Sequence, residues 1–191
     1  MGMSVSVTMD LGQLLALPDD GLRHELLDGL HVVSPSPSLA HQRAVGMFYE
    51  ALRALIRRGD LDGNRAEVLL SPADLRLGPR TLVQPDIFVL PVSSGERLER
   101  WADAAVPLLV VEVLSPSTAA HDHATKRSIY LEAGVEEYWI VDIDARGVHR
   151  WRTGDLRPEF INSELRFTLT ASGSGTISLP ELFAVITGRS T

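Results

Sequence analysis

The apolar residues of this chain follow two periods, one typical of helices and one typical of strands. Helical spacing predicts helices over residues 11–17, 40–58, 119–133 and 180–185. Residues 22–33 predict a hairpin that turns at Asp28-Gly29. Further strands are predicted over residues 66–71, 74–77, 83–90, 108–114, 137–142, 148–152, 165–170 and 176–177. Because Pro85 interrupts the run 83–90, an edge strand or a bulge is expected there.

The segment 108–142 indicates the fold class. Residues 108–114 are apolar on both faces except for Glu112, a pattern typical of a central strand. The helix that follows ends at Gly134, and the next strand covers residues 137–142. A connection of this length joins parallel strands. Since no repeat or linker is visible, we expect a single α/β (α+β) domain over residues 1–191, with a mixed sheet.

Composition excludes several classes of protein. The chain has 191 residues, 45% of them hydrophobic, and no cysteine, which excludes disulfides, thiolate zinc sites and cysteine nucleophiles. No apolar stretch is long enough to span a membrane, and residues 1–10 lack a signal-like pattern, so a cytoplasmic location fits. The net charge of −7 argues against a surface that coats nucleic acid, but it allows a local basic groove. Lys126 is the sole lysine.

Three residues suggest chemistry. A buried Glu112 would need a cation, a metal or a proton as its partner. Alternatively, Glu112 lies half-exposed at a strand end and pairs with an arginine. Asp86 begins another apolar run, and if the two strands are neighbours both carboxylates suit a hard cation such as Mg²⁺. Lys126 could hold a water nucleophile or stabilise charge on a phosphate, or it could form an exposed ion pair with Asp122.

Several of these residues also carry a family resemblance. The chain resembles the Uma-two family, described as "putative restriction endonucleases" and similar to the PD-(D/E)xK nucleases. The resemblance lies in Pro85-Asp86, Val111–Thr118, Asp122, Lys126, Tyr130, residues 133–135 and Glu137–Asp142, supported by residues 25–29, 34–38, His41 and residues 75–77.

The resemblance implies a restriction-endonuclease-like fold, in which a mixed sheet is flanked by helices, and a set of site residues. Asp86, Glu112 and the backbone carbonyl of Val113 would hold Mg²⁺, with Mn²⁺ as a substitute, and Glu25 would add a further acid. The superfamily's strand lysine is replaced by Leu114, so Lys126 would take its catalytic role from the helix.

Two weaker candidates could bind substrate. His41, at the head of the long predicted helix, could contact a phosphate or be a solvated helix-end residue. Gln84 could line the pocket or lie on a strand surface. Tyr138-Trp139 is interpreted as core packing.

We therefore expect a Mg²⁺-dependent endonuclease that hydrolyses DNA. The alternative is a catalytically silent nuclease-like fold that binds nucleic acid or a protein partner, which Leu114 and the charge of −7 favour. A metal-dependent hydrolase of small phosphoesters is a third possibility. A homodimer is also plausible, with the apolar segments around Trp101 and Phe160 as contributors.

Overall fold

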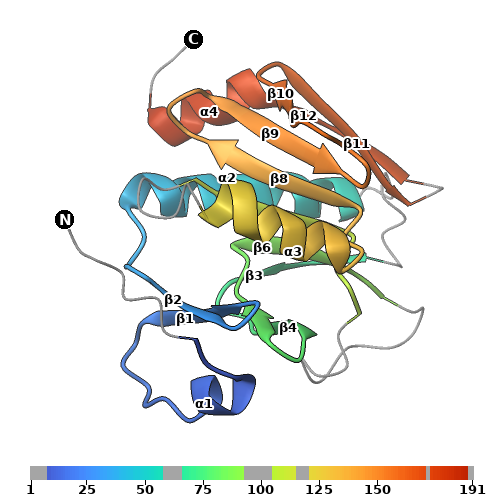
Figure 1. Cartoon of the computed structure of the whole chain (residues 1–191). Helices are drawn as coiled ribbons and strands as arrows, with labels where there is room; N and C mark the ends of the chain where they lie inside the picture. Colours follow the sequence, from blue (N-terminus) through green and yellow to red (C-terminus); the bar gives the residue numbers. More distant parts are fainter. Residues whose placement is uncertain (1–7, 58–65, 93–104, 115–120, 171–172, 189–191) are drawn as a thin grey trace.

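The computed structural model describes residues 8–57, 66–92, 105–114, 121–170 and 173–188 (Figure 1). The helices are α1 (Leu11–Leu15), α2 (Leu39–Arg57), α3 (Arg127–Glu132) and α4 (Leu179–Thr187), and a π-helical segment, η2 (His121–Lys126), leads directly into α3. The strands are β1 (Arg23–Leu27), β2 (Leu30–Ser34), β3 (Ala66–Leu70), β4 (Leu75–Gly78), β5 (Thr81–Val83), β6 (Ile87–Pro91), β7 (Leu109–Val113), β8 (Glu137–Asp142), β9 (Gly147–Arg152), β10 (Glu159–Ile161), β11 (Glu164–Thr170) and β12 (Gly173–Ser178).

The strands form three sheets. The largest has the order β10-β9-β8-β7-β6-β3, in which β7 and β8 are parallel and the other neighbours are antiparallel. A four-stranded sheet has the order β2-β1-β5-β4, and β11 pairs with β12. The predicted mixed sheet flanked by helices is therefore confirmed, and the two smaller sheets were not foreseen.

Alternation along the central strands divides the core between the two faces of the large sheet. One face packs against α2 and α4 through Phe48, Phe183, Val111 and Trp139. The other packs against α3 and the small sheet through Tyr130, Val110 and Tyr138, and Figure 1 shows α2 and α3 on opposite sides of the central strands. Since Tyr138 and Trp139 are both fully buried, their assignment to the core is confirmed.

The hairpin prediction is confirmed, and the prediction around Pro85 is wrong. Asp28 and Gly29 have φ values of 50° and 87°, which suit a tight turn between β1 and β2. Residues 83–90 do not form one edge strand, because β5 ends at Val83 in the small sheet and β6 starts at Ile87 inside the large one. Pro85, which has no N–H to donate, lies in the link between the sheets, where no ladder bond is needed.

Other elements also differ from the prediction. Within the predicted helix 119–133, residues 121–126 are π-helical, and only residues 127–132 are α-helical. The short strand β10 was missed because three residues give too little periodicity to detect.

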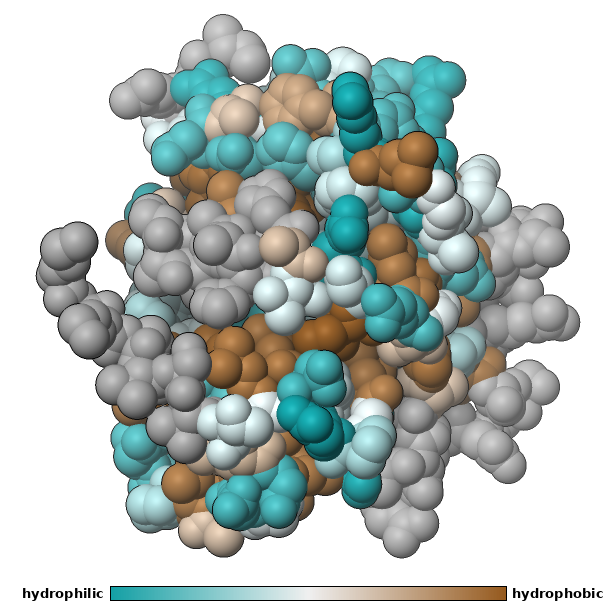
Figure 2. All heavy atoms as spheres, viewed as in Figure 1, coloured by the Kyte–Doolittle hydropathy of each residue, from teal (hydrophilic) through white to brown (hydrophobic). Residues whose placement is uncertain are grey.

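The surface is mixed. Figure 2 shows polar side chains over much of one face, with apolar ones gathered across its middle. Phe160 is 45% exposed, whereas Trp101 lies outside the described residues, so the homodimer stays a prediction. No helix in the described ranges has the length and apolar character that a membrane crossing requires.

Candidate functional site

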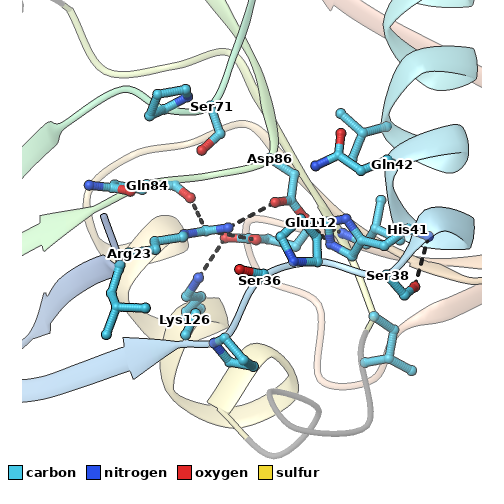
Figure 3. Close-up of a pocket in the computed structure, with 18 of the residues that line it drawn as sticks. Arg23, Ser36, Ser38, His41, Gln42, Ser71, Gln84, Asp86, Glu112 and Lys126 are labelled. Carbon is cyan, nitrogen blue, oxygen red and sulfur yellow. Dashed lines mark hydrogen bonds and ion pairs between the residues drawn. The ribbon is translucent and has the colours of Figure 1, made fainter. Parts of the chain in front are cut away.

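Four parts of the chain bring five charged side chains together at one end of β6 and β7. Figure 3 labels Arg23, Asp86, Glu112 and Lys126 among them. Arg23 and Glu25 come from β1, where residues two apart share a face. Asp86 lies just before β6, Glu112 lies near the end of β7, and Lys126 ends η2. The four predicted catalytic residues are therefore neighbours in space.

Strand pairing explains why the two acids meet. Ile87 pairs with Val111 in the antiparallel β6–β7 ladder, so the residue before Ile87 lies beside the residues after Val111. The N–H of Val113 donates to Asp86 Oδ2 at 2.9 Å. Since the N–H and C=O of one strand residue point to the same side, the Val113 carbonyl is directed to the Asp86 side of β7 as well.

The sole lysine joins two of the acids. Lys126 Nζ lies 3.0 Å from Glu25 Oε1 and 2.9 Å from Glu112 Oε1. The hydroxyl of Tyr130 donates to the same Glu112 oxygen at 2.9 Å. Because Lys126 is only 3% exposed and pairs with Glu25 and Glu112, it is not the exposed residue that the ion-pair alternative expected, and the side chain of Asp122 lies outside the described part of the chain. Glu112, 2% exposed, is also far from half-exposed, although it does pair with an arginine, as that alternative expected.

Asp86 is held in its charged form. Its Oδ1 lies 2.9 Å from Arg23 Nη1, and its Oδ2 lies 3.1 Å from His41 Nε2. Burial raises the pKa of Asp86, but the hydrogen bond from His41 and the charge of Arg23 outweigh it and lower the pKa to about 2.

The two predicted substrate-binding residues lie at the site in different ways. His41, in the first turn of α2, is buried and contacts Asp86 directly. Burial lowers the pKa of His41, but the hydrogen bond and charge of Asp86 raise it overall. Gln84 contributes through its main chain: its N–H donates to Glu25 Oε1 at 2.8 Å and its carbonyl accepts from Arg23. Its side chain donates to Asp74 instead.

Sequence reasoning gave no role to two members of the site, Arg23 and Tyr130. Spacing carried a signal for both of them. Arg23 precedes Glu25 by two residues on a strand, and Tyr130 follows Lys126 by four residues along a helix, so each shares a face with a predicted site residue. Burial raises the pKa of Tyr130 well above its ordinary value, and the charge of Glu112 adds to this, so Tyr130 stays a neutral donor.

The cluster lies at a cavity of about 510 Å³. Away from the charged groups, the wall is neutral. It consists mainly of Ser34, Pro35, Ser36, Pro37, Ser38, Gln42, Ser71, Pro72 and Leu114. A polar ligand in this cavity would therefore meet hydroxyl and amide groups on one side and the buried charges on the other.

The donor set suits a hard divalent cation. The chemistry is that of oxygen ligands: two carboxylates from Asp86 and Glu112, with the Val113 carbonyl on the same side of β7. Among the described residues no three histidine, aspartate or glutamate side chains are arranged to hold a metal. The predicted set is smaller, with two side chains and one main-chain oxygen, and Arg23 and Lys126 contact its carboxylates.

Comparison of the sequence with known protein families identifies the family of this chain. The Uma2 (Uma-two) family model, described as "Putative restriction endonuclease", matches residues 11–183. The chain belongs to the Uma-two family. The match includes every predicted site residue, so the resemblance seen in the sequence is confirmed.

A solved structure resembles this Uma-two protein in fold. It is a "putative nuclease" from Anabaena variabilis ATCC 29413, with a TM-score of 0.76 and 18% sequence identity. The similarity covers 93% of this chain and 99% of that one. At this identity the likeness shows the fold alone, and the mixed sheet flanked by helices that was predicted is shared by the two structures. A comparison with curated proteins gives no match.

Proposed function

We propose that this Uma-two protein is a Mg²⁺-dependent endonuclease that hydrolyses phosphodiester bonds of DNA. The observation that carries the proposal is the convergence of Asp86, Glu112 and Lys126 at one cavity, with Glu25 paired to Lys126 behind it. Burying charged groups costs several kcal/mol each, so a fold that collects four of them without need would be unstable. Membership of a nuclease-type family supports the same reaction class.

Asp86, Glu112 and the Val113 carbonyl would hold the Mg²⁺ or Mn²⁺ ion. A bound divalent ion supplies Lewis-acid chemistry, since it polarises a phosphate and lowers the pKa of a coordinated water. The fold prepares these ligands in advance, because the Val113 N–H fixes the Asp86 carboxylate and the Tyr130 hydroxyl fixes that of Glu112.

Lys126 is the proposed catalytic cation. Its ammonium would position the attacking water or neutralise charge that grows on the phosphate. Glu25 positions this ammonium, because its Oε1 accepts both from Lys126 at 3.0 Å and from the Gln84 N–H at 2.8 Å. His41 and Gln84 line the cavity, where they would contact the phosphate backbone. A cytoplasmic location and a single domain over residues 1–191 belong to the same proposal.

A silent nuclease-like fold is the second candidate. Leu114 lies at the cavity in the position where the superfamily carries its lysine, and the site acids are paired with Arg23 and Lys126. In that case the cavity would bind nucleic acid or a protein partner without cutting it.

Cleavage assays separate the two candidates. Supercoiled plasmid, single-stranded DNA and a chromogenic phosphodiester are incubated with the full chain and Mg²⁺ or Mn²⁺. We expect Asp86→Asn and Lys126→Met each to lower the cleavage rate at least about 100-fold. The matched control Glu137→Gln changes a buried acid elsewhere. Its cleavage rate should stay within about threefold of the wild-type rate, a far smaller change than that of the site variants.

Cleavage that persists unchanged in both site variants, with the fold verified by circular dichroism, contradicts the proposal. Hydrolysis of the chromogenic substrate alone would indicate a hydrolase of small phosphoesters.

A further inference from the structure

Arg23 lies within ion-pair distance of all three site carboxylates, two of which, Asp86 and Glu112, are labelled beside it in Figure 3. Its Nη1 lies 2.9 Å from Asp86 Oδ1. Its Nη2 lies 3.5 Å from Glu25 Oε1 and 3.6 Å from Glu112 Oε2. The guanidinium therefore bridges the two acids that are proposed to hold the divalent ion, and it supplies the positive charge between them.

A divalent ion and this guanidinium compete for the same negative charge. Arg23 and Lys126 already bring two permanent positive charges to the three carboxylates of Glu25, Asp86 and Glu112. A divalent ion bound by Asp86 and Glu112 would lie within a few ångströms of the guanidinium, where like charges repel strongly in a weakly polar surrounding. The guanidinium must therefore move if the ion binds.

Arg23 is the member of the cluster best placed to move. Its side chain is 22% exposed and borders the cavity, whereas that of Lys126 is 4% exposed. Two of its carboxylate contacts, at 3.5 and 3.6 Å, are longer than a strong charged hydrogen bond. Its Nε is buried and has no hydrogen-bond partner among the described residues, so its present bonding is incomplete.

We propose that Arg23 is a tethered cation that exchanges partners. Without a divalent ion its guanidinium holds the carboxylates together, and with the ion bound it turns into the cavity and binds a phosphate of the substrate. A guanidinium fits this second partner because its planar donors pair with two phosphate oxygens at once. The proposal rests on the proposed metal site and adds a substrate-binding residue to it.

The first test measures Mn²⁺ binding by calorimetry, with the full chain at fixed pH and salt. Arg23→Gln removes the competing charge, so it should bind Mn²⁺ at least about tenfold more tightly than the wild type. Arg23→Lys keeps a charge and should stay closer to the wild type. Arg166→Gln is the control, since Arg166 is 77% exposed on β11 and should leave the affinity unchanged.

The second test measures binding of a phosphorothioate oligothymidylate at saturating Mn²⁺. Here Arg23→Gln should bind about tenfold more weakly, because the phosphate loses its bidentate partner. Opposite changes for the metal and the oligonucleotide identify an exchange, since a residue with a merely structural role would weaken both. Equal or weaker Mn²⁺ binding by Arg23→Gln overturns the inference, and so does undiminished binding of the oligonucleotide. If neither the wild type nor the variant binds Mn²⁺, the proposed metal site fails together with the inference.

Discussion

Buried acids occur in two regions of this molecule, and they are paired in different ways. In the region of β8 and β9, Glu137 accepts from Arg152 Nε at 3.0 Å and from Trp139 Nε1 at 2.7 Å. Arg152 is the cross-strand partner of Glu137, so sheet register alone brings them together. This region has one acid, one cation and one neutral donor, which is a complete pairing.

The cavity region is built differently. Its three acids come from β1, from the link before β6 and from β7, and they share Arg23 and Lys126. Register places Asp86 beside Glu112, but Glu25 and Lys126 come from elements outside the β6–β7 ladder, so the full arrangement depends on contacts between segments far apart in the chain. An ion pair between cross-strand partners indicates a role in stabilising the fold. Acids that share cations at a cavity instead indicate a binding site for a positively charged ligand.

The largest expected effect breaks the cavity cluster. Lys126→Met leaves Glu25 and Glu112 buried without their ammonium, so it should lower the free energy of unfolding by about 3–5 kcal/mol in the absence of divalent ions. Arg152→Met should cost only about 1 kcal/mol, because Arg152 is 46% exposed and Trp139 still donates to Glu137. Urea denaturation of both variants measures the difference. Equal losses of unfolding free energy in the two variants would show that the buried acids of the two regions depend on their cations to the same extent.

The next effect is a pH dependence. The pKa of Asp86 is lowered to about 2 in the folded protein, so its charge contributes stability that is fully present above its ordinary pKa and is lost as pH falls toward 2. A pKa lowered to this extent corresponds to a stability contribution of about 2–3 kcal/mol. Between pH 6 and pH 2, denaturation should show a smaller loss of unfolding free energy in Asp86→Asn than in the wild type. The exposed Asp144→Asn should follow the wild type.

The smallest effect concerns a neutral donor. Tyr130→Phe removes the hydroxyl that donates to Glu112, so it should destabilise the protein by about 2 kcal/mol, the range of a hydrogen bond to a charged group. Tyr49→Phe, on the half-buried side of α2, should change stability by less than about 0.5 kcal/mol. Thermal unfolding of the two variants compares them. No loss in Tyr130→Phe would mean that this hydroxyl does not support the Glu112 carboxylate.

Two of the cavity acids and the lysine could be predicted from sequence because they contrast with their surroundings, whereas Glu25 was indicated only by the family resemblance. Glu112 interrupts an apolar strand, Asp86 follows Pro85 before another strand, and Lys126 is the one lysine of the chain. Arg23 was missed because it is one of 17 arginines and has no such contrast.

The elements of the fold show the same limit. The turn at Asp28-Gly29 was predictable because it is a local signal, whereas the division of residues 83–90 between two sheets was not. Strand periodicity says that a segment is extended, but it does not say which sheet the segment joins.

Mn²⁺ titration of the full chain tests the central claim most directly, by comparing the wild type with Glu112→Gln and Glu137→Gln. We expect one Mn²⁺ site per chain. Its affinity should fall at least about tenfold in Glu112→Gln, which loses one of two carboxylate ligands, and stay unchanged in Glu137→Gln. Equal affinity in the wild type and Glu112→Gln, or no Mn²⁺ binding by the wild type, would contradict the claim that the cavity acids form a divalent-cation site.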